Sequence, residues 1–146
     1  RCVLNIAPFA SETASIASSA SVLVANESEF RLLLGDAGNV NLELAIVELA
    51  ARNKQTIVVT LGENGALVGS AAEPVIRIPA WPVRVVDTVG AGDTFCGYLA
   101  AGLSAGQSIG AAAQRAVVAA SLACKARGAQ AAIPLSDDVD RLVKYH

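Results

Sequence analysis

Apolar and polar positions along the chain follow two different periods, and these predict strands and helices in turn. The run 56–61 is β-branched and continuous, which is typical of a strand buried on both faces. Residues 40–52 instead carry apolar side chains at i, i+3, i+4 and i+7 from Leu42, which predicts an amphipathic helix. The turn-forming sequence 62–65 follows the strand 56–61 and predicts a hairpin-like connection to the next strand.

The same criteria place the other elements. Further strands are expected at 1–6, 22–25, 66–69, 75–78 and 83–86. Further helices are expected at 15–20, 27–34, 94–104, 109–125 and 137–145. Ser136 is the expected N-cap of the last helix, and Gly128 is an expected cap beyond the helix 109–125. Strands that alternate with helices, then a hairpin, then packed helices predict an α/β fold with a mainly parallel sheet.

Composition narrows the class of protein. The 146 residues are 53% apolar and 16% charged, which is enough to bury the core of about one domain. Many apolar positions are small, with 29 alanines, which suits close helix packing. A net charge of -2 argues against a nucleic-acid binder. No apolar run approaches a membrane span and no signal peptide is visible, so we predict a cytoplasmic protein.

Cysteine and histidine usage restricts the chemistry. The cysteines Cys2, Cys96 and Cys124 lie far apart in apolar stretches, and we interpret them as buried free thiols in a reducing compartment. The single histidine is His146, so a Cys/His zinc site is not expected. A general base in this chain is therefore expected to be a carboxylate. The chain also begins at Arg1 inside an expected strand, and we expect it to be the C-terminal part of a longer protein.

The stretch 87–97, with the sequence DTVGAGDTFCG, is the strongest candidate for chemistry. Small residues at 90–92 let the backbone turn tightly and let a ligand approach it. The following helix begins with unpaired N–H groups, which favour an anion. Asp93 beside such a site suits the removal of a proton from an attacking hydroxyl. The alternative is structural, with Asp93 as a helix cap and the glycines as an ordinary turn.

This stretch resembles the D-T-x-G-A-G-D-x-F-x-G signature of the ribokinase-like (pfkB) carbohydrate kinases. All eight fixed positions are matched, by Asp87, Thr88, Gly90, Ala91, Gly92, Asp93, Phe95 and Gly97. The resemblance implies that Asp93 is the catalytic base. It also implies that Gly90, Ala91 and Gly92 form the anion hole for the transferred phosphate.

Other segments resemble further motifs of the family. Asn26 and Glu29 match an N-x-x-E motif that is associated with Mg²⁺ and phosphate, although alone they indicate only a helix start. The T-L-G-x-x-G motif of the nucleotide loop is matched by Thr60, Leu61, Gly62, Glu63, Asn64 and Gly65, which alone indicate a turn. The stretch 5–8 resembles an N-x-A-P motif, and the resemblance places Val117 beside adenine. The family also binds K⁺, for which the implied ligands are Asp87, Val89, Ala123, Ala126 and Gly128.

The resemblance implies a three-layer α/β/α sandwich of ribokinase type, of which residues 1–146 are the C-terminal, nucleotide-binding and catalytic-base portion. The substrate and lid portion, through which such kinases often form homodimers, is expected to be absent. The implied activity is ATP-dependent phosphoryl transfer to a hydroxyl of a sugar such as ribose. The alternatives are a nucleoside kinase on the same scaffold and a catalytically silent, ribokinase-like binding subunit. The isolated chain is expected to be inactive.

Overall fold

The computed structural model describes residues 2–35 and 40–145, so Arg1 of the first expected strand and His146 lie outside the described residues. The chain divides into two compact units, Arg1–Arg77 and Ile78–His146. No helix in the described part of the chain combines the length and the apolar character that crossing a membrane requires.

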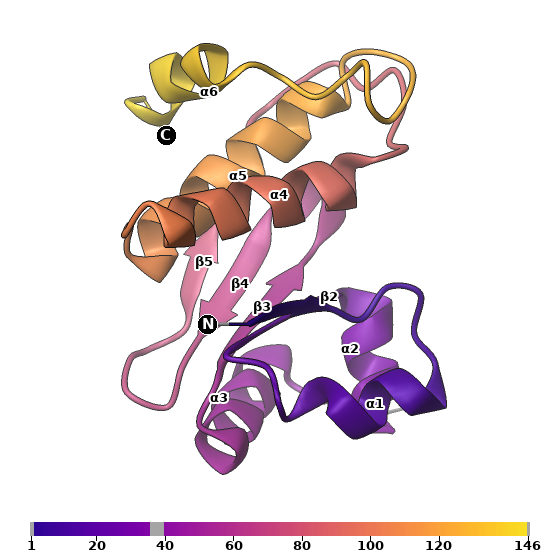
Figure 1. Ribbon diagram of the computed structural model, residues 1–146, viewed down its shortest axis with the longest axis vertical. Coiled ribbons are helices and arrows are strands. Elements are labelled where there is room, and N and C mark those ends of the chain that lie inside the picture. Colours follow the sequence, from indigo (N-terminus) through magenta and orange to yellow (C-terminus); the bar gives the residue numbers. More distant parts are fainter. Residues whose placement is uncertain (1, 36–39, 146) are drawn as a thin grey trace. The chain divides into compact units, whose positions relative to one another are not determined.

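The first unit is built around the sheet, whose strand order is β1-β2-β3-β4-β5. Its strands are β1 (Val3–Asn5), β2 (Val22–Asn26), β3 (Thr56–Thr60) and β4 (Ala66–Gly69), and β5 (Ile76–Ile78) spans the boundary at which the second unit begins. β1, β2 and β3 pair in parallel, and β4 returns antiparallel to β3 across a short turn (Figure 1). The hairpin-like connection expected from the sequence is therefore confirmed.

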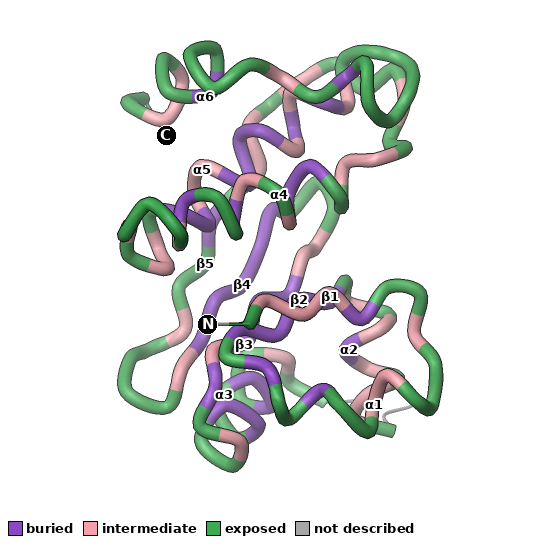
Figure 2. The backbone as a smooth tube through the Cα atoms, in the orientation of Figure 1, coloured by how far each residue is buried: buried purple, intermediate pink, exposed green. Residues whose placement is uncertain are grey.

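Three helices of the first unit cover one face of these strands. They are α1 (Ser11–Ala17), α2 (Glu27–Leu34) and α3 (Leu42–Asn53). Their buried side chains form one core with alternate strand residues; its largest members include Leu23, Phe30, Ile46, Ile57 and Leu67. Val24, Val58 and Val68 point to the opposite face and are also buried, which confirms β3 as a strand buried on both faces (Figure 2).

The second unit consists of three helices and long connecting segments. α4 (Ala91–Ser104) and α5 (Ile109–Ala123) lie side by side (Figure 1), and α6 (Ser136–Val143) packs on α5. A Cβ at Gly102 of α4 would lie 2.9 Å from the Cβ of Ala112 on α5, so the glycine allows the two helices to approach closely. Val139 of α6 is buried against Val118 and Ala119 of α5.

Four local predictions are wrong. Residues 83–86 form no strand, because the Val86 N–H donates to the carbonyl of Cys124 at the end of α5 rather than to a neighbouring strand. Gly128 caps no helix: α5 ends at Ala123, and the Gly128 N–H donates to Asp87. Ser136 is the first residue of α6, whose N-cap is Leu135. The three cysteines are free, but none is buried: Cys2 is exposed, and Cys96 and Cys124 are half-buried.

Two helices begin earlier than the sequence pattern predicts. α1 covers residues 11–17 instead of 15–20, because the chain turns at Ser18 and Ser19, where the Ser19 N–H donates to the carbonyl of Ile16. α4 begins at Ala91 rather than at Thr94, because Gly90 adopts a left-handed conformation that turns the chain directly into the helix. The second difference brings the whole stretch 91–93 into the first turn of a helix.

Candidate active site

The carboxyl ends of β2 and β3 bring two of the predicted motifs together. Asn26 and Thr60, the last residues of these strands, are direct partners in the parallel register. Ligands of open α/β sheets bind beyond the carboxyl ends of parallel strands. Asn26 and Thr60 therefore lie next to each other at the end of the sheet where a ligand is expected.

Asn26 and Glu29 form a capping box at the start of α2. The Asn26 Oδ1 accepts the Glu29 N–H at 2.8 Å, and the Glu29 Oε2 accepts the Asn26 N–H at 3.0 Å. These two hydrogen bonds cap the N-terminus of α2, so helix capping alone accounts for both residues. Asn26 is exposed and Glu29 is half-buried, and each carbonyl or carboxylate oxygen can accept more than one hydrogen bond. The oxygen donors fit a hard cation such as Mg²⁺ that is approached through water.

The segment after β3 is a tight loop. A 3₁₀ turn covers Gly62–Asn64, and the Leu61 N–H donates to the carbonyl of Gly65 at 2.7 Å. Gly62 and Gly65 have φ values of 58° and 86°, which side chains rarely adopt. Gly62, Glu63 and Asn64 are exposed, so the outer surface of this loop is open to a ligand.

In the second unit, the turn before α4 presents its backbone to solvent. Gly90 adopts a left-handed conformation with φ 80°, and its carbonyl accepts the Thr94 N–H at 2.9 Å. The Ala91 N–H donates to the carbonyl of Thr88 at 3.2 Å, so of the three predicted anion-hole residues Ala91 has its amide already engaged. The amides of Gly92 and Asp93 belong to the first turn of α4, where a helix supplies no acceptor.

Gly92 and Asp93 lie where a ligand can reach them. Gly92 is exposed, and a Cβ built on it meets no atom within 4 Å. Asp93 is exposed on the same helical turn. The first turn of α4 therefore combines amide groups that lack a helical acceptor, open space and a carboxylate within two consecutive residues. This arrangement can bind an anion and can accept a proton from a group that attacks it.

Asp87 connects this turn to the segment that follows α5. Its Oδ1 accepts the Val89 N–H at 3.1 Å, and its Oδ2 accepts the Gly128 N–H at 3.3 Å. These two backbone donors hold the pKa of Asp87 below its ordinary value, and the hydrogen bond from Val89 has the larger effect. The positive charge of Arg127 lowers the pKa further. The carboxylate therefore stays charged and ties the two backbone segments together.

The predicted ligands of a monovalent cation are only partly gathered. Asp87, Val89 and Gly128 are joined by the hydrogen bonds just described. Ala123 is buried in α5 and its carbonyl accepts the Ala126 N–H at 3.4 Å, so it is the donor least suited to an ion. Val117 is buried in α5 and offers a packing surface only. Among residues 2–35 and 40–145, no three His, Cys, Asp or Glu side chains gather as metal ligands.

Sequence reasoning missed two features of the second unit. Thr94, directly after Asp93, is buried with no hydrogen-bond partner for its hydroxyl among the described residues. Ala129 packs so closely on Gly90 that a Cβ at Gly90 would lie 2.8 Å from the Ala129 Cα. Neither feature has a local sequence signal, because each depends on how segments distant in the sequence pack.

Comparison with known proteins identifies relatives across nearly the whole chain. The sequence profile of the pfkB family carbohydrate kinases matches residues 2–136. Ribokinase of Bacillus subtilis is 35% identical over 141 residues, which are 97% of this chain and 45% of that protein. Deoxyribokinase of Salmonella typhi is 33% identical over 135 residues, which are 90% of this chain and 44% of that protein. The chain thus spans about half the length of these curated relatives.

Solved structures agree with this assignment. The ribokinase of Thermotoga maritima matches with a TM-score of 0.87 and 28% identity, over 97% of this chain and 48% of that one. The ribokinase of Cryptococcus neoformans var. grubii in complex with ADP matches with a TM-score of 0.76 and 29% identity, over 95% of this chain and 50% of that one. Phosphofructokinase-2 of Escherichia coli in complex with potassium matches with a TM-score of 0.86 and 26% identity, over 99% of this chain and 47% of that one. The predicted three-layer fold of ribokinase type is confirmed.

Proposed function

This chain belongs to the pfkB family of carbohydrate kinases, and we propose that the protein transfers the γ-phosphoryl group of ATP to a hydroxyl of ribose or a related sugar. The observation that carries the proposal is the first turn of α4, where the exposed Asp93 directly follows the open backbone of Gly92. The likeness to a ribokinase and a deoxyribokinase favours a pentose over a nucleoside.

In this proposal Asp93 is the general base. Its carboxylate takes the proton of the sugar hydroxyl while the hydroxyl oxygen forms a bond to the γ-phosphorus. The bond between that phosphorus and the bridging oxygen of ADP breaks in the same transfer. The amides of Gly92 and Asp93, with the dipole of α4, stabilise the negative charge on the moving group. Gly90 contributes by its left-handed turn, which aims the backbone outward.

ATP is the proposed phosphoryl donor. The loop 60–65 is a proposed nucleotide contact, and Val117 of α5, which is buried, is proposed only on the resemblance to the family. Mg²⁺, held by Asn26 and Glu29 through water, would neutralise phosphate charge when bound. Asp87, Val89, Ala126 and Gly128, with Ala123 as the weakest donor, are the proposed ligands of K⁺. One similar structure is a complex with ADP and another is a complex with potassium, and these ligands of the two neighbours support the assignments proposed for this chain.

The test is Asp93→Asn in the full-length protein, which keeps the shape of the side chain and removes its ability to accept a proton. We expect turnover to fall by about 10²–10⁴ while ATP binding is retained. Asp137 is a matched control, because it is also exposed in the first turn of a helix, α6. Asp137→Asn should phosphorylate a panel of ribose, deoxyribose and nucleosides as the wild type does. Wild-type turnover in Asp93→Asn would contradict the proposal and leave Asp93 as a helix-stabilising residue.

A further inference from the structure

The segment 126–134, between α5 and α6, touches the turn that precedes α4 at two points. The Gly128 N–H donates to the Asp87 carboxylate at 3.3 Å. One residue later, Ala129 packs against Gly90 so closely that an added Cβ on Gly90 would lie 2.8 Å from both its Cα and its Cβ. The backbone around the proposed anion hole therefore rests on this segment, and a displaced segment would leave Gly90 without that support.

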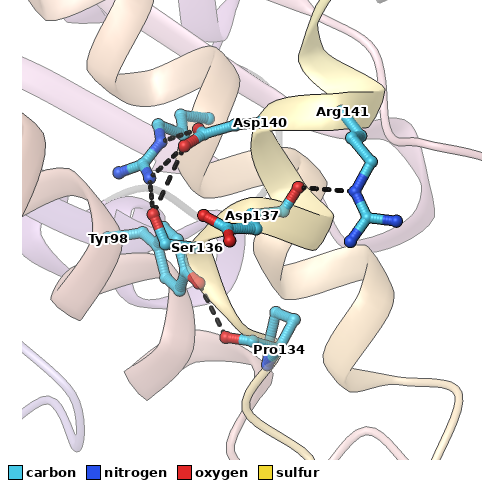
Figure 3. Close-up of polar contacts among 7 residues, drawn as sticks. Tyr98, Pro134, Ser136, Asp137, Asp140 and Arg141 are labelled. Carbon is cyan, nitrogen blue, oxygen red and sulfur yellow. Dashed lines mark hydrogen bonds and ion pairs between the residues drawn. The ribbon is translucent and has the colours of Figure 1, made fainter.

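Two side chains from α4 and α5 hold the far end of the same segment. The Tyr98 hydroxyl of α4 donates to the Pro134 carbonyl at 2.7 Å. Arg115 of α5 forms a bidentate ion pair with Asp140, at 2.6 Å to Oδ1 and 3.1 Å to Oδ2, and also donates to the Ser136 hydroxyl. Figure 3 shows Ser136 and Asp140 close together at the start of α6, with the Tyr98 hydroxyl reaching Pro134.

These contacts form one connected group. The Arg115 guanidinium lies 5.2 Å from the centre of the Tyr98 ring, within the range of a cation–π contact. The Arg115 side chain is only 15% exposed, whereas the Arg141 side chain in the pair with Asp138, inside α6, is 73% exposed. A shielded, bidentate pair is more strongly oriented than an exposed one. The polar group therefore fixes where α6 begins on α4 and α5.

Apolar packing alone would not fix this position. Val139 is buried against Val118 and Ala119, and this apolar contact also holds α6 on α5. Such packing is not directional, whereas the hydrogen bonds to Pro134 and Ser136 set the place where the segment 126–134 ends. Tyr98 also lies on α4, the helix whose first turn carries Asp93. The same helix thus carries the proposed base and the anchor of the segment beside it.

We propose that Tyr98 and Arg115 are positioning residues: their bonds to Pro134, Ser136 and Asp140 hold the segment 126–134 against the Asp87–Gly90 turn and thereby fix the proposed anion hole. The inference rests on the proposed function, because only a phosphoryl-transfer site needs these amides in one place. Neither residue contacts the reacting atoms in this scheme, and both act through the backbone of Gly128 and Ala129.

The test compares four substitutions in the full-length protein. Tyr98→Phe removes one hydroxyl, and Arg115→Lys keeps the charge but cannot form the bidentate pair. The controls are Tyr145→Phe, which removes a hydroxyl from a residue that is 82% exposed, and Arg141→Lys in the exposed pair. Tyr98→Phe carries the test by itself if Arg115→Lys does not fold. Amide hydrogen exchange over 126–134 and the separate values of kcat and KM for ATP are measured for each.

Tyr98→Phe should speed exchange at Gly128 by about fivefold, since one hydrogen bond contributes about 1 kcal/mol. Exchange within α4 and α5 should not change. The value of kcat should fall about tenfold with little change in the KM for ATP, because the anion hole acts on charge that develops in the transition state. The two controls should match the wild type in both measurements.

Unchanged exchange at Gly128 in Tyr98→Phe would overturn the inference, even if Asp93→Asn abolishes turnover. Faster exchange with wild-type kcat would overturn it as well, because the segment would then move without affecting the reaction. Full turnover in Asp93→Asn would instead contradict the proposed function. The two failures are therefore distinguished by different variants.

Discussion

At the scale of single residues, two glycines two positions apart have different reasons to be glycine. Gly90 has a left-handed conformation and faces the backbone of Ala129, so its need is conformational and steric. Gly92 has neither feature, and open space surrounds the position of its missing Cβ. A Cβ at Gly92 would meet no atom within 4 Å, so packing does not explain this glycine, whereas the proposed approach of a phosphate to its backbone does.

Substitution of these two glycines should therefore separate stability from function. Gly92→Val should leave the thermal unfolding midpoint close to that of the wild type and reduce phosphoryl transfer at least about 100-fold, because the side chain occupies the approach to the Gly92 amide. Gly90→Ala should lower the free energy of unfolding by about 1–3 kcal/mol through the left-handed strain and the contact with Ala129. Calorimetry and a coupled kinase assay measure the two quantities. Near-wild-type activity in Gly92→Val would mean that no phosphate sits at that amide.

At the scale of elements, the start of α2 carries a structural motif to which we also assign a proposed function. The capping box of Asn26 and Glu29 is complete within the helix, so its role in folding needs no ligand. Its position beside Thr60, at the carboxyl ends of β2 and β3, is what relates it to a nucleotide site. The cap is evident from the sequence alone, whereas the adjacency depends on the strand register.

Asn26→Ala should lower the free energy of unfolding by about 1 kcal/mol through loss of the cap. It should also raise the Mg²⁺ concentration at which turnover is half-maximal. Asn41 is a matched control, because its side chain caps α3 by accepting the N–H groups of Glu43 and Leu44. Asn41→Ala should lose similar stability without changing the Mg²⁺ requirement. An equal Mg²⁺ response in both variants would restrict Asn26 to capping.

The ion pair that joins α5 and α6 predicts a pH dependence of stability. The hydrogen bonds from Arg115 hold the pKa of Asp140 below its ordinary value, which for an unfolded aspartate is about 3.9. The pair therefore stabilises the folded state fully above that pH, and this contribution is lost as the pH falls through the folded pKa. The wild type should unfold at a higher temperature than Asp140→Asn at pH 7, and the difference should shrink as acid protonates the carboxylate. A difference that stays constant with pH would exclude the charge of Asp140 as the cause.

At the scale of the whole molecule, the sequence predicts elements whose signals are local. The helix Glu27–Leu34 and the strand Ala66–Gly69 have the expected bounds, because a cap, a glycine turn and continuous apolar runs define them. Residues 83–86 alternate like a strand, yet Val85 and Val86 are 58% and 54% exposed and the backbone bonds to the end of α5. No periodicity in 83–86 could reveal that partner.

The candidate site divides in the same way. Asp93 and the glycines before it could be found from the sequence because their spacing is a local motif. The support of Gly90 by Ala129, and the tie between Asp87 and Gly128, depend on the path of the segment after α5. Positioning residues such as Tyr98 carry no motif, since an isolated tyrosine in an amphipathic helix predicts only packing.

The last prediction concerns residues 1–146 expressed alone. The relatives are about twice as long, since the chain covers 45% of the Bacillus subtilis ribokinase and 48% of the Thermotoga maritima chain. β1 is the first strand of the sheet order, so one of its edges is unpaired among the described residues. An unpaired strand edge invites association. We therefore expect this polypeptide to scatter light through association, to bind ATP weakly and to phosphorylate no sugar.

Weak ATP binding should remain because the loop 60–65 and the first turn of α4 both lie within this polypeptide. Light scattering, calorimetric titration with ATP and a phosphorylation assay on ribose and deoxyribose measure the three properties. Asp93→Asn in the same polypeptide is the control, and it should bind ATP as the unsubstituted chain does, because the carboxylate is proposed to act on the sugar hydroxyl. A monomer that phosphorylates ribose efficiently would show that residues 1–146 contain a complete sugar site and would contradict this prediction.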